Sequence, residues 1–153
     1  MLEVQNSLQA YGIIRIHFNP CVEEVWVLAL NSQLQLLGKE MIFRGTVDSC
    51  PIHPRDIFRY LIMKNATSFV LVHNHPSNSV EPSSEDIEIT GKLRQLSDLI
   101  EITILDHLII GLDKYYSFAD FGMLKQIIDP SCLRHQRSAS DLMEYELGLL
   151  KSL

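Results

Sequence analysis

The stretch 24–30 is the feature that most restricts the fold, because it reads Glu-Val-Trp-Val-Leu-Ala-Leu and is apolar at almost every position. A strand with one face in water alternates apolar and polar residues, whereas a continuous apolar run is typical of a strand covered on both faces. A second short run of this kind occupies 68–72. The sequence therefore predicts a sheet whose central strands are buried on both sides.

The remaining elements follow from periodicity and from their end signals. Helices are expected at 55–64, where Pro54 suits a first turn, and at 84–99, where Ser83 suits the N-cap. Further strands are expected at 13–18, 34–43, 102–111 and 115–118. This order of elements predicts an α/β or α+β sheet flanked by helices.

The 153 residues fit one folded domain with a large core. The pattern changes after Gly122, so we divide the chain into a domain at 1–125 and a C-terminal helical arm at 126–153. Within the arm, 138–153 is amphipathic, and its apolar residues cover more than one narrow stripe. The arm can therefore pack on the domain or on a second subunit, which leaves a homo-oligomer as an open alternative.

Charge and cysteine content exclude several classes of protein. The net charge is −6, whereas nonspecific binding of nucleic acid relies on surplus Lys and Arg. No apolar run reaches the roughly 20 residues that span a bilayer, and the N-terminus lacks the shape of a secretory signal. The cysteines, Cys21, Cys50 and Cys132, are odd in number and far apart, which argues against a disulfide scaffold. We expect a cytoplasmic protein, with nucleic acid and membrane disfavoured as partners.

His73 and His75 are the residues whose spacing points to chemistry. They lie two apart at the end of a predicted strand, so that both imidazoles project from one face. Asp86 stands in the first turn of the next predicted helix, which a loop can return to the strand end. Two imidazoles and one carboxylate leave a fourth position open, as in catalytic zinc sites. The alternative is a capping box, Ser83-x-x-Asp86, in which Asp86 binds only a backbone N–H.

A catalytic zinc site needs further groups, because the water that it activates requires a general base. Glu24, at the start of the apolar strand, is the candidate for this base, and Glu23 is the alternative. Ser83 is close enough to Asp86 to donate to a developing oxyanion. The pair Asp106-His107 either orients a metal ligand or holds the end of the sheet as a buried hydrogen-bonded pair.

These residues carry a resemblance to a known family. The segments His-Asn-His-Pro-Ser at 73–77 and Pro-Ser-x-x-Asp at 82–86 resemble the signature of the RadC family, within the wider JAMM (MPN+) metalloprotease group. The similarity extends over about 24–124. It implies a cytidine-deaminase-like JAB fold with a mixed sheet, and a zinc-dependent hydrolase that cleaves a peptide or isopeptide bond. It implies these roles: His73, His75 and Asp86 as zinc ligands, Glu24 as general acid and base, and Ser83 as the residue that assists the oxyanion.

Two other functions use the same fold. One is a non-catalytic interaction module, which the complete set of three ligands counts against. The other is a DNA-repair-associated protein, as the family name suggests. The acidic balance counts against it, as does the lack of room in this chain for the helix-hairpin-helix region of many RadC proteins. The substrate is not readable from the sequence.

Overall fold

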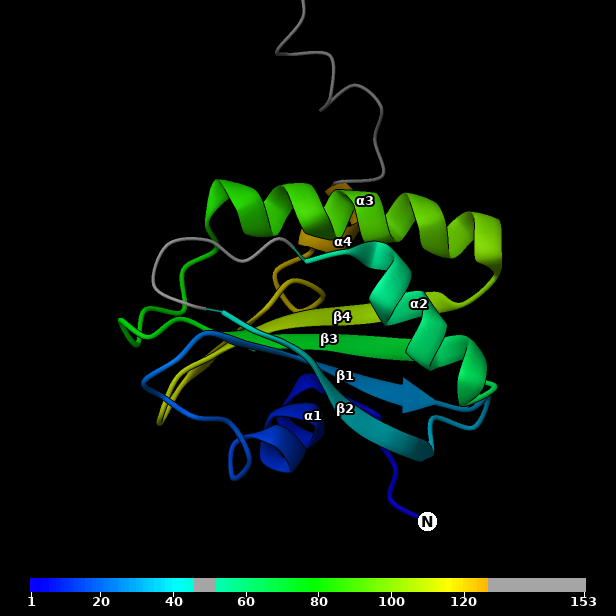
Figure 1. The fold of residues 1–153 in the computed structure, drawn as a ribbon, viewed down its shortest axis with the longest axis horizontal. Helices are drawn as coiled ribbons and strands as arrows, with labels where there is room; N and C mark the ends of the chain where they lie inside the picture. The colour runs from blue at the N-terminus through cyan, green and yellow to red at the C-terminus, as the bar shows by residue number, and fades with distance from the viewer. Residues whose placement is uncertain (46–51, 127–153) are drawn as a thin grey trace, which may run out of the picture.

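A mixed five-stranded sheet forms the centre of the computed structural model, which describes residues 1–45 and 52–126 (Figure 1). Its strands in chain order are β1 (Glu24–Leu30), β2 (Leu36–Arg44), β3 (Ser68–Asn74), β4 (Thr103–Ile110) and β5 (Tyr115–Ser117). The order across the sheet is β2-β1-β3-β4-β5. Only β3 and β4 pair in parallel among these neighbours, and the others pair antiparallel.

Helices cover both faces of the sheet. The helix α1 (Ser7–Ile14) lies on one face, and α2 (Pro54–Met63) and α3 (Ser84–Ile100) lie on the other (Figure 1). The short helix α4 (Met123–Gln126) lies beside α3. The parallel pair β3 and β4 is joined through α3, as a parallel connection requires. The α/β class, with a mixed sheet flanked by helices, is thus confirmed.

The apolar run of β1 is explained by two separate cores. Val25 and Val27 belong to the core beneath α2 and α3, whereas Leu28 and Leu30 belong to the core beneath α1. All four side chains are fully buried. Alternate residues of β1 therefore face opposite helical layers, and this alternation decides which side chains reach the site described below.

The prediction of a strand at 13–18 is wrong, because α1 ends at Ile14 and a turn follows it. The N-cap of α1 is Asn6, whose Oδ1 accepts the Gln9 N–H at 2.9 Å. Ala10, Tyr11 and Ile14 are buried at helical spacing. Short apolar runs fit a strand or a helix equally well, and here the capping residue several positions earlier was the informative signal.

The expected C-terminal arm at 126–153 lies outside the described residues, apart from Gln126 at the end of α4. Its helical character and a subunit contact through it stay predictions. Each helix within the described ranges is too short or too polar to traverse a lipid bilayer.

Candidate metal centre

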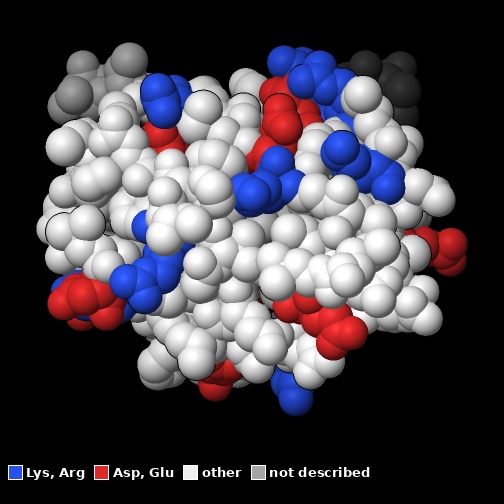
Figure 2. Space-filling model, turned by 90° about the horizontal axis from the view of Figure 1, so that it is seen from below, with Lys and Arg blue, Asp and Glu red and all other residues white. Residues whose placement is uncertain are grey.

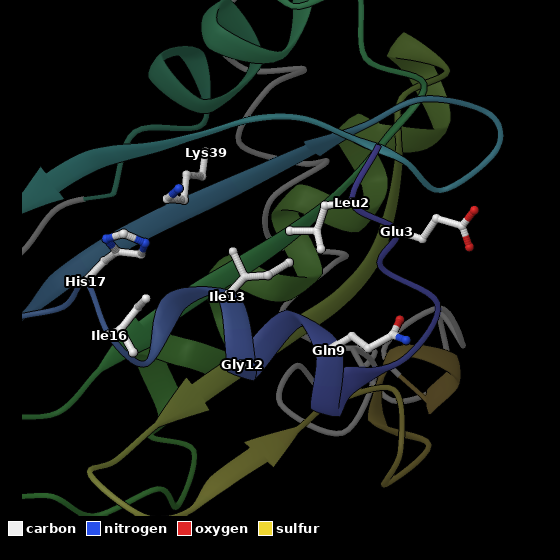
Figure 3. Close-up of a pocket in the computed structure, with 8 residues that line it drawn as sticks. All are labelled: Leu2, Glu3, Gln9, Gly12, Ile13, Ile16, His17 and Lys39. Carbon is white, nitrogen blue, oxygen red and sulfur yellow. The ribbon is translucent and has the colours of Figure 1, made fainter.

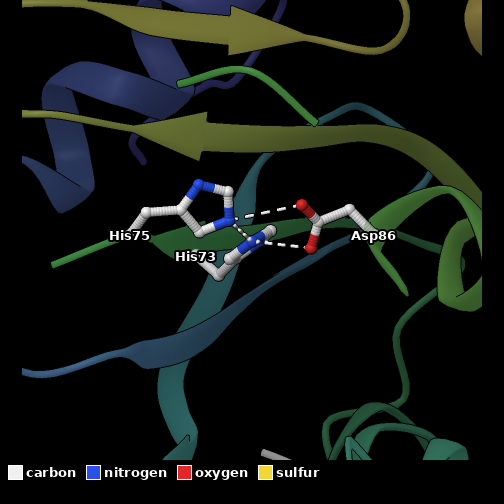
Figure 4. Close-up of side chains that lie close together, drawn as sticks. All are labelled: His73, His75 and Asp86. Atoms are coloured by element: carbon white, nitrogen blue, oxygen red, sulfur yellow. Dashed lines mark hydrogen bonds and ion pairs between the residues drawn. The ribbon is translucent and has the colours of Figure 1, made fainter. Parts of the chain in front are cut away.

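Three side chains converge at the end of β3, near the start of α3 (Figure 4). The Nε2 atoms of His73 and His75 are 3.0 Å apart. Asp86 places Oδ1 3.0 Å from Nε2 of His73 and Oδ2 3.2 Å from Nε2 of His75. β3 ends at Asn74, so His75 already belongs to the following loop. The structure thus brings the three predicted ligands together, although only His73 lies within the strand.

The loop between β3 and α3 is held by Asn78. Its φ of 60° lies in the left-handed region, which asparagine tolerates better than most residues. Its N–H donates to the carbonyl of His75 at 2.9 Å, and its Oδ1 accepts the Leu112 N–H at 2.9 Å. The turn therefore anchors His75 to the connection between β4 and β5.

Ser83 and Asp86 form the capping box that the sequence left as an alternative. Ser83 Oγ accepts the Asp86 N–H at 3.2 Å, and Asp86 Oδ2 accepts the Ser83 N–H at 2.7 Å. The same carboxylate faces both histidines. The cap and the ligand role are therefore compatible, and the cap fixes the rotamer that turns Oδ1 toward His73. The Ser83 hydroxyl accepts in this pair, which leaves its own hydrogen for another acceptor.

The chemistry of the three donor groups fits a zinc ion. The Nδ1 atom of His75 lies 3.0 Å from the carbonyl oxygen of Ser79. A carbonyl only accepts, so Nδ1 carries a hydrogen and Nε2 is the nitrogen available to a metal ion. Zinc–nitrogen bonds of roughly 2.0–2.1 Å place tetrahedral ligand atoms about 3.3 Å apart. The observed separations of 3.0 and 3.2 Å are close to that value.

The electrostatics of the site also favour a bound cation. Burial opposes the ionisation of Asp86, but hydrogen bonds from His73 and His75 outweigh it and hold its pKa well below the ordinary range. The hydrogen bond to Asp86 raises the pKa of His75, although burial opposes the rise. The Ser79 carbonyl and the charge of Glu23 add to it. The site thus stabilises positive charge beside an ionised carboxylate.

The structure does not bring Glu24 to this group of ligands. The Glu24 side chain is fully buried, and its Oε1 accepts two bonds from the Arg44 guanidinium, at 2.6 and 3.0 Å. Its Oε2 accepts the Trp26 Nε1–H at 3.0 Å and the Asn19 N–H at 3.1 Å. Trp26 packs in the core beneath α1, so Glu24, two residues earlier, shares that face of the sheet. The histidines lie toward the other face.

Glu23, the alternative to Glu24, lies on the side of the ligands. Val25 pairs with His73 in the ladder of β1 and β3, and it packs beneath α2 and α3. Glu23 directly precedes β1, and strand alternation continued by one residue would place its side chain on the face of Val25. The Glu23 carbonyl accepts the Gly45 N–H at 2.8 Å, which extends the pairing of β1 and β2 by one step. Its side chain is partly exposed, and its charge reaches His75.

Asp106 and His107 have separate contacts. The His107 ring is fully buried and lies between His73 and Thr90, with Nε2 2.7 Å from His73 Nδ1. Asp106 instead accepts the backbone N–H groups of His107 and Ala119. Burial lowers the pKa of His107 well below its ordinary value and raises the pKa of Asp106. The sequence pointed to the pair but did not separate the roles of its members, and it did not indicate Thr90 as their neighbour.

The opposite face of the sheet carries a groove between α1 and β2 (Figure 3). Aliphatic side chains of Leu2, Ile13 and Ile16 line much of it, together with Lys39. On the side of the molecule nearest α1, Lys and Arg side chains occur in separate groups, with Asp and Glu among them (Figure 2). Most of that surface is uncharged. Among the residues that the structure describes, the group of candidate metal ligands lies elsewhere, and the charged side chains of this face form no continuous basic area.

Comparisons with known proteins give one consistent result. The family model described as RadC-like JAB domain matches residues 4–123. A UPF0758 protein of Chlorobaculum parvum is 44% identical over 102 residues, which are 67% of this chain and 46% of that protein. The UPF0758 protein YeeS of Escherichia coli K12 is 44% identical over 102 residues, covering 67% and 69% of the two chains. The chain spans about half the length of most curated relatives that it matches.

Proposed function

We propose that the protein is a zinc-dependent hydrolase of amide bonds, from the premise that this chain belongs to the RadC-like JAB domain family. One observation carries the proposal. Two imidazole Nε2 atoms and one carboxylate meet within 3.0 to 3.2 Å on one face of the sheet, and the charge of Glu23 acts on His75. Three protein ligands with a fourth position open are the composition of catalytic zinc sites rather than structural ones.

His73, His75 and Asp86 would hold the ion. Bound in this way, zinc supplies Lewis acidity and lowers the pKa of a water ligand to about 7. The imidazoles would bind through Nε2, because Nδ1 of His75 is engaged by Ser79 and Nδ1 of His73 by His107. The capping box would hold Asp86 in place whether or not the ion is bound.

Glu23 takes the role of general base in this proposal, in place of Glu24. It would accept the proton of the attacking water and return it to the leaving nitrogen. A base needs a carboxylate that is open to water and near the ligands. Glu23 is partly exposed and its charge acts on His75, whereas Glu24 is fully buried and accepts four hydrogen bonds. Glu24 would instead stabilise the start of β1.

Ser83 would donate its hydroxyl hydrogen to the oxyanion that develops on the substrate carbonyl. Its oxygen is fixed by the N–H of Asp86, one of the ligands, so the hydroxyl lies at the border of the site. Preorganised donors of this kind contribute strongly to acyl transfer. The substrate that fits this machinery is a peptide or isopeptide bond in a protein or peptide.

The test combines metal analysis with a cleavage assay. The purified protein and its His75→Ala and Glu23→Gln variants are loaded with zinc, desalted and analysed for metal. They are then incubated with fluorogenic peptide and isopeptide substrates, with and without a chelator. We expect about one zinc per chain in the parent and in Glu23→Gln, none in His75→Ala, and chelator-sensitive cleavage by the parent alone. A parent chain that retains no zinc would overturn the proposal.

A further inference from the structure

A chain of hydrogen-bonding groups runs behind the candidate ligands and connects two of them through the interior. It starts at His73, whose Nδ1 lies 2.7 Å from Nε2 of His107. Nδ1 of His107 lies 2.6 Å from Oγ1 of Thr90, and this hydroxyl donates to the backbone carbonyl of Asp86 at 2.5 Å. His107 and Thr90 are both fully buried.

The direction of this chain follows from its last member. A carbonyl oxygen only accepts, so the single hydrogen of the Thr90 hydroxyl is used on Asp86. The Thr90 oxygen must then accept from Nδ1 of His107. A neutral imidazole has one N–H, so Nε2 of His107 presents a lone pair and accepts from Nδ1 of His73. Nε2 of His73, on the other side of the ring, then faces Nε2 of His75 and Oδ1 of Asp86, where a bound cation would take its lone pair.

The surroundings of His107 support a neutral ring in this orientation. The ring of Phe118 stacks on it with centroids 4.7 Å apart and planes 10° from parallel. Within the described residues, its two nitrogens contact only His73 and Thr90, and the neighbouring Asp106 carboxylate binds the backbone N–H of His107 instead of the ring. The reverse direction would set Nδ1 of His107 and the Thr90 oxygen against each other as two acceptors, 2.6 Å apart and without water.

We propose that His107 and Thr90 are positioning residues, which hold His73 in its Nδ1–H tautomer so that Nε2 is available as a metal ligand. This inference rests on the proposed zinc site. It adds that a buried chain of hydrogen bonds, the relay, determines which nitrogen of His73 binds the ion. The relay runs through His107 and Thr90 and ends on the backbone carbonyl of Asp86, a second proposed ligand. The start of α3 and the ends of β3 and β4 are thereby coupled to the binding of one ion.

In this proposal both histidines carry hydrogen on Nδ1 and direct Nε2 at the site, but different groups accept that hydrogen. His75 donates Nδ1–H to the Ser79 carbonyl in a partly exposed loop, whereas His73 donates to a fully buried side chain. Groups that orient a ligand from behind typically contribute about 10- to 100-fold to metal affinity. We expect the larger loss of metal affinity when the hydrogen bond of His73 is removed, because water cannot replace its buried acceptor, His107.

The relay is tested with Thr90→Val and its matched control Thr90→Ser. Valine keeps the shape of threonine but removes the hydroxyl, whereas serine keeps the hydroxyl and loses one methyl. Two measurements are made on the full chain. The first is the NMR signal of the Nδ1–H of His73 in zinc-loaded protein, whose chemical shift and rate of exchange with solvent report its hydrogen bond to His107. The second is zinc affinity, by competition with a chromophoric chelator.

In the parent and in Thr90→Ser we expect a slowly exchanging Nδ1–H of His73, and in Thr90→Val a shifted and faster-exchanging one, with zinc affinity about 10- to 100-fold lower. A parent whose His73 Nδ1–H exchanges freely with solvent, or a Thr90→Val protein with the Nδ1–H signal and the zinc affinity of the parent, would overturn the relay. If Thr90→Val does not fold, His107→Phe with His107→Gln as control gives the same comparison, because glutamine retains an acceptor. Zinc binding that is weaker in Thr90→Val than in the parent, without amide cleavage by the parent, would support the relay while the proposed hydrolase fails.

Discussion

The Glu24 N–H of β1 donates to Oδ1 of Asn74 in β3 at 3.0 Å, one step beyond the pair of Val25 and His73. Asn74 stands between His73 and His75, so this pairing sets the position of the ligand strand relative to β1. It also sends Glu24 to one face of the sheet and its neighbour Glu23 to the other. The consequences for the two glutamates differ sharply.

Replacing Glu23 should affect catalysis without affecting the fold. We expect Glu23→Gln to lower kcat for amide cleavage by about 10²- to 10⁴-fold, the usual contribution of a general base. Zinc content and thermal stability should stay those of the parent, because Glu23 is partly exposed and is not a proposed ligand. Steady-state kinetics beside metal analysis would check this. Full activity in Glu23→Gln would reject the assignment.

Replacing Glu24 should affect the fold first. Glutamine at this position would set an amide N–H₂ against donors from Arg44, or from Trp26 and Asn19. A buried group without a hydrogen-bond partner costs about 1–3 kcal/mol of the free energy of unfolding. The cost here should lie toward the lower end, because the Arg44 side chain is 54% exposed and water can replace the lost bond. Urea denaturation of Glu24→Gln measures the loss. An unchanged stability with abolished cleavage would return the catalytic role to Glu24.

Zinc should stabilise the folded protein. With zinc at 100-fold above its Kd, binding adds about 2.7 kcal/mol to the free energy of unfolding, which thermal denaturation detects as a higher Tm. His73→Ala, His75→Ala and Asp86→Asn should each lose most of this shift. Magnesium is the control ion, since it prefers oxygen ligands and should give little shift. Equal shifts with both ions would contradict a His-based site.

Ser83 has two roles that a matched pair of variants can separate. Ser83→Ala removes the N-cap of α3 and should cost about 0.5–2 kcal/mol of stability. Ser83→Asn retains a capping oxygen but no hydroxyl, so it should keep most of the stability. Both should lower kcat, by up to about 10²- to 10³-fold, if the hydroxyl stabilises the oxyanion. Recovery of activity along with stability in Ser83→Asn would show that the cap alone matters.

Asp106 should make stability depend on pH. Burial raises its pKa in the folded state, so the folded protein favours the protonated carboxyl. The stabilising contribution is fully present below the unfolded value of about 3.9 and is lost as pH rises through the folded-state pKa. Asn at this position cannot titrate. The stability of the parent relative to Asp106→Asn should therefore fall as pH rises through this window, as urea denaturation at several pH values would show. A constant difference would contradict it.

Much of the fold was predictable, because burial leaves a periodic trace in the sequence. The continuous apolar run of β1 indicated helices on both sides of the sheet, and Pro54 and Ser83 marked the starts of two of them. α1 was missed because 13–18 was interpreted without the capping signal of Asn6. Short apolar segments are ambiguous in period, and only their packing against the sheet decides between helix and strand.

The three candidate ligands could be named from the sequence because their arrangement is local. His73 and His75 lie two residues apart, and Asp86 starts the very next helix, so short-range geometry brings them together. The choice between Glu23 and Glu24 is different in kind. Successive residues of a strand face opposite sides, and a shift of one residue exchanges them, so the answer depends on the register of β1 against β3.

The sequence by itself determined the class of fold, the group of candidate ligands and the capping residue of α3, because each follows from local spacing or from periodic burial. The tertiary structure alone decided which glutamate faces the ligands and that His107 and Thr90 stand behind His73. Those relationships join residues of β1, β3, α3 and β4, and they are set by strand register and by the packing of one helix on the sheet. Neither strand register nor helix packing can be predicted from a single segment of the sequence.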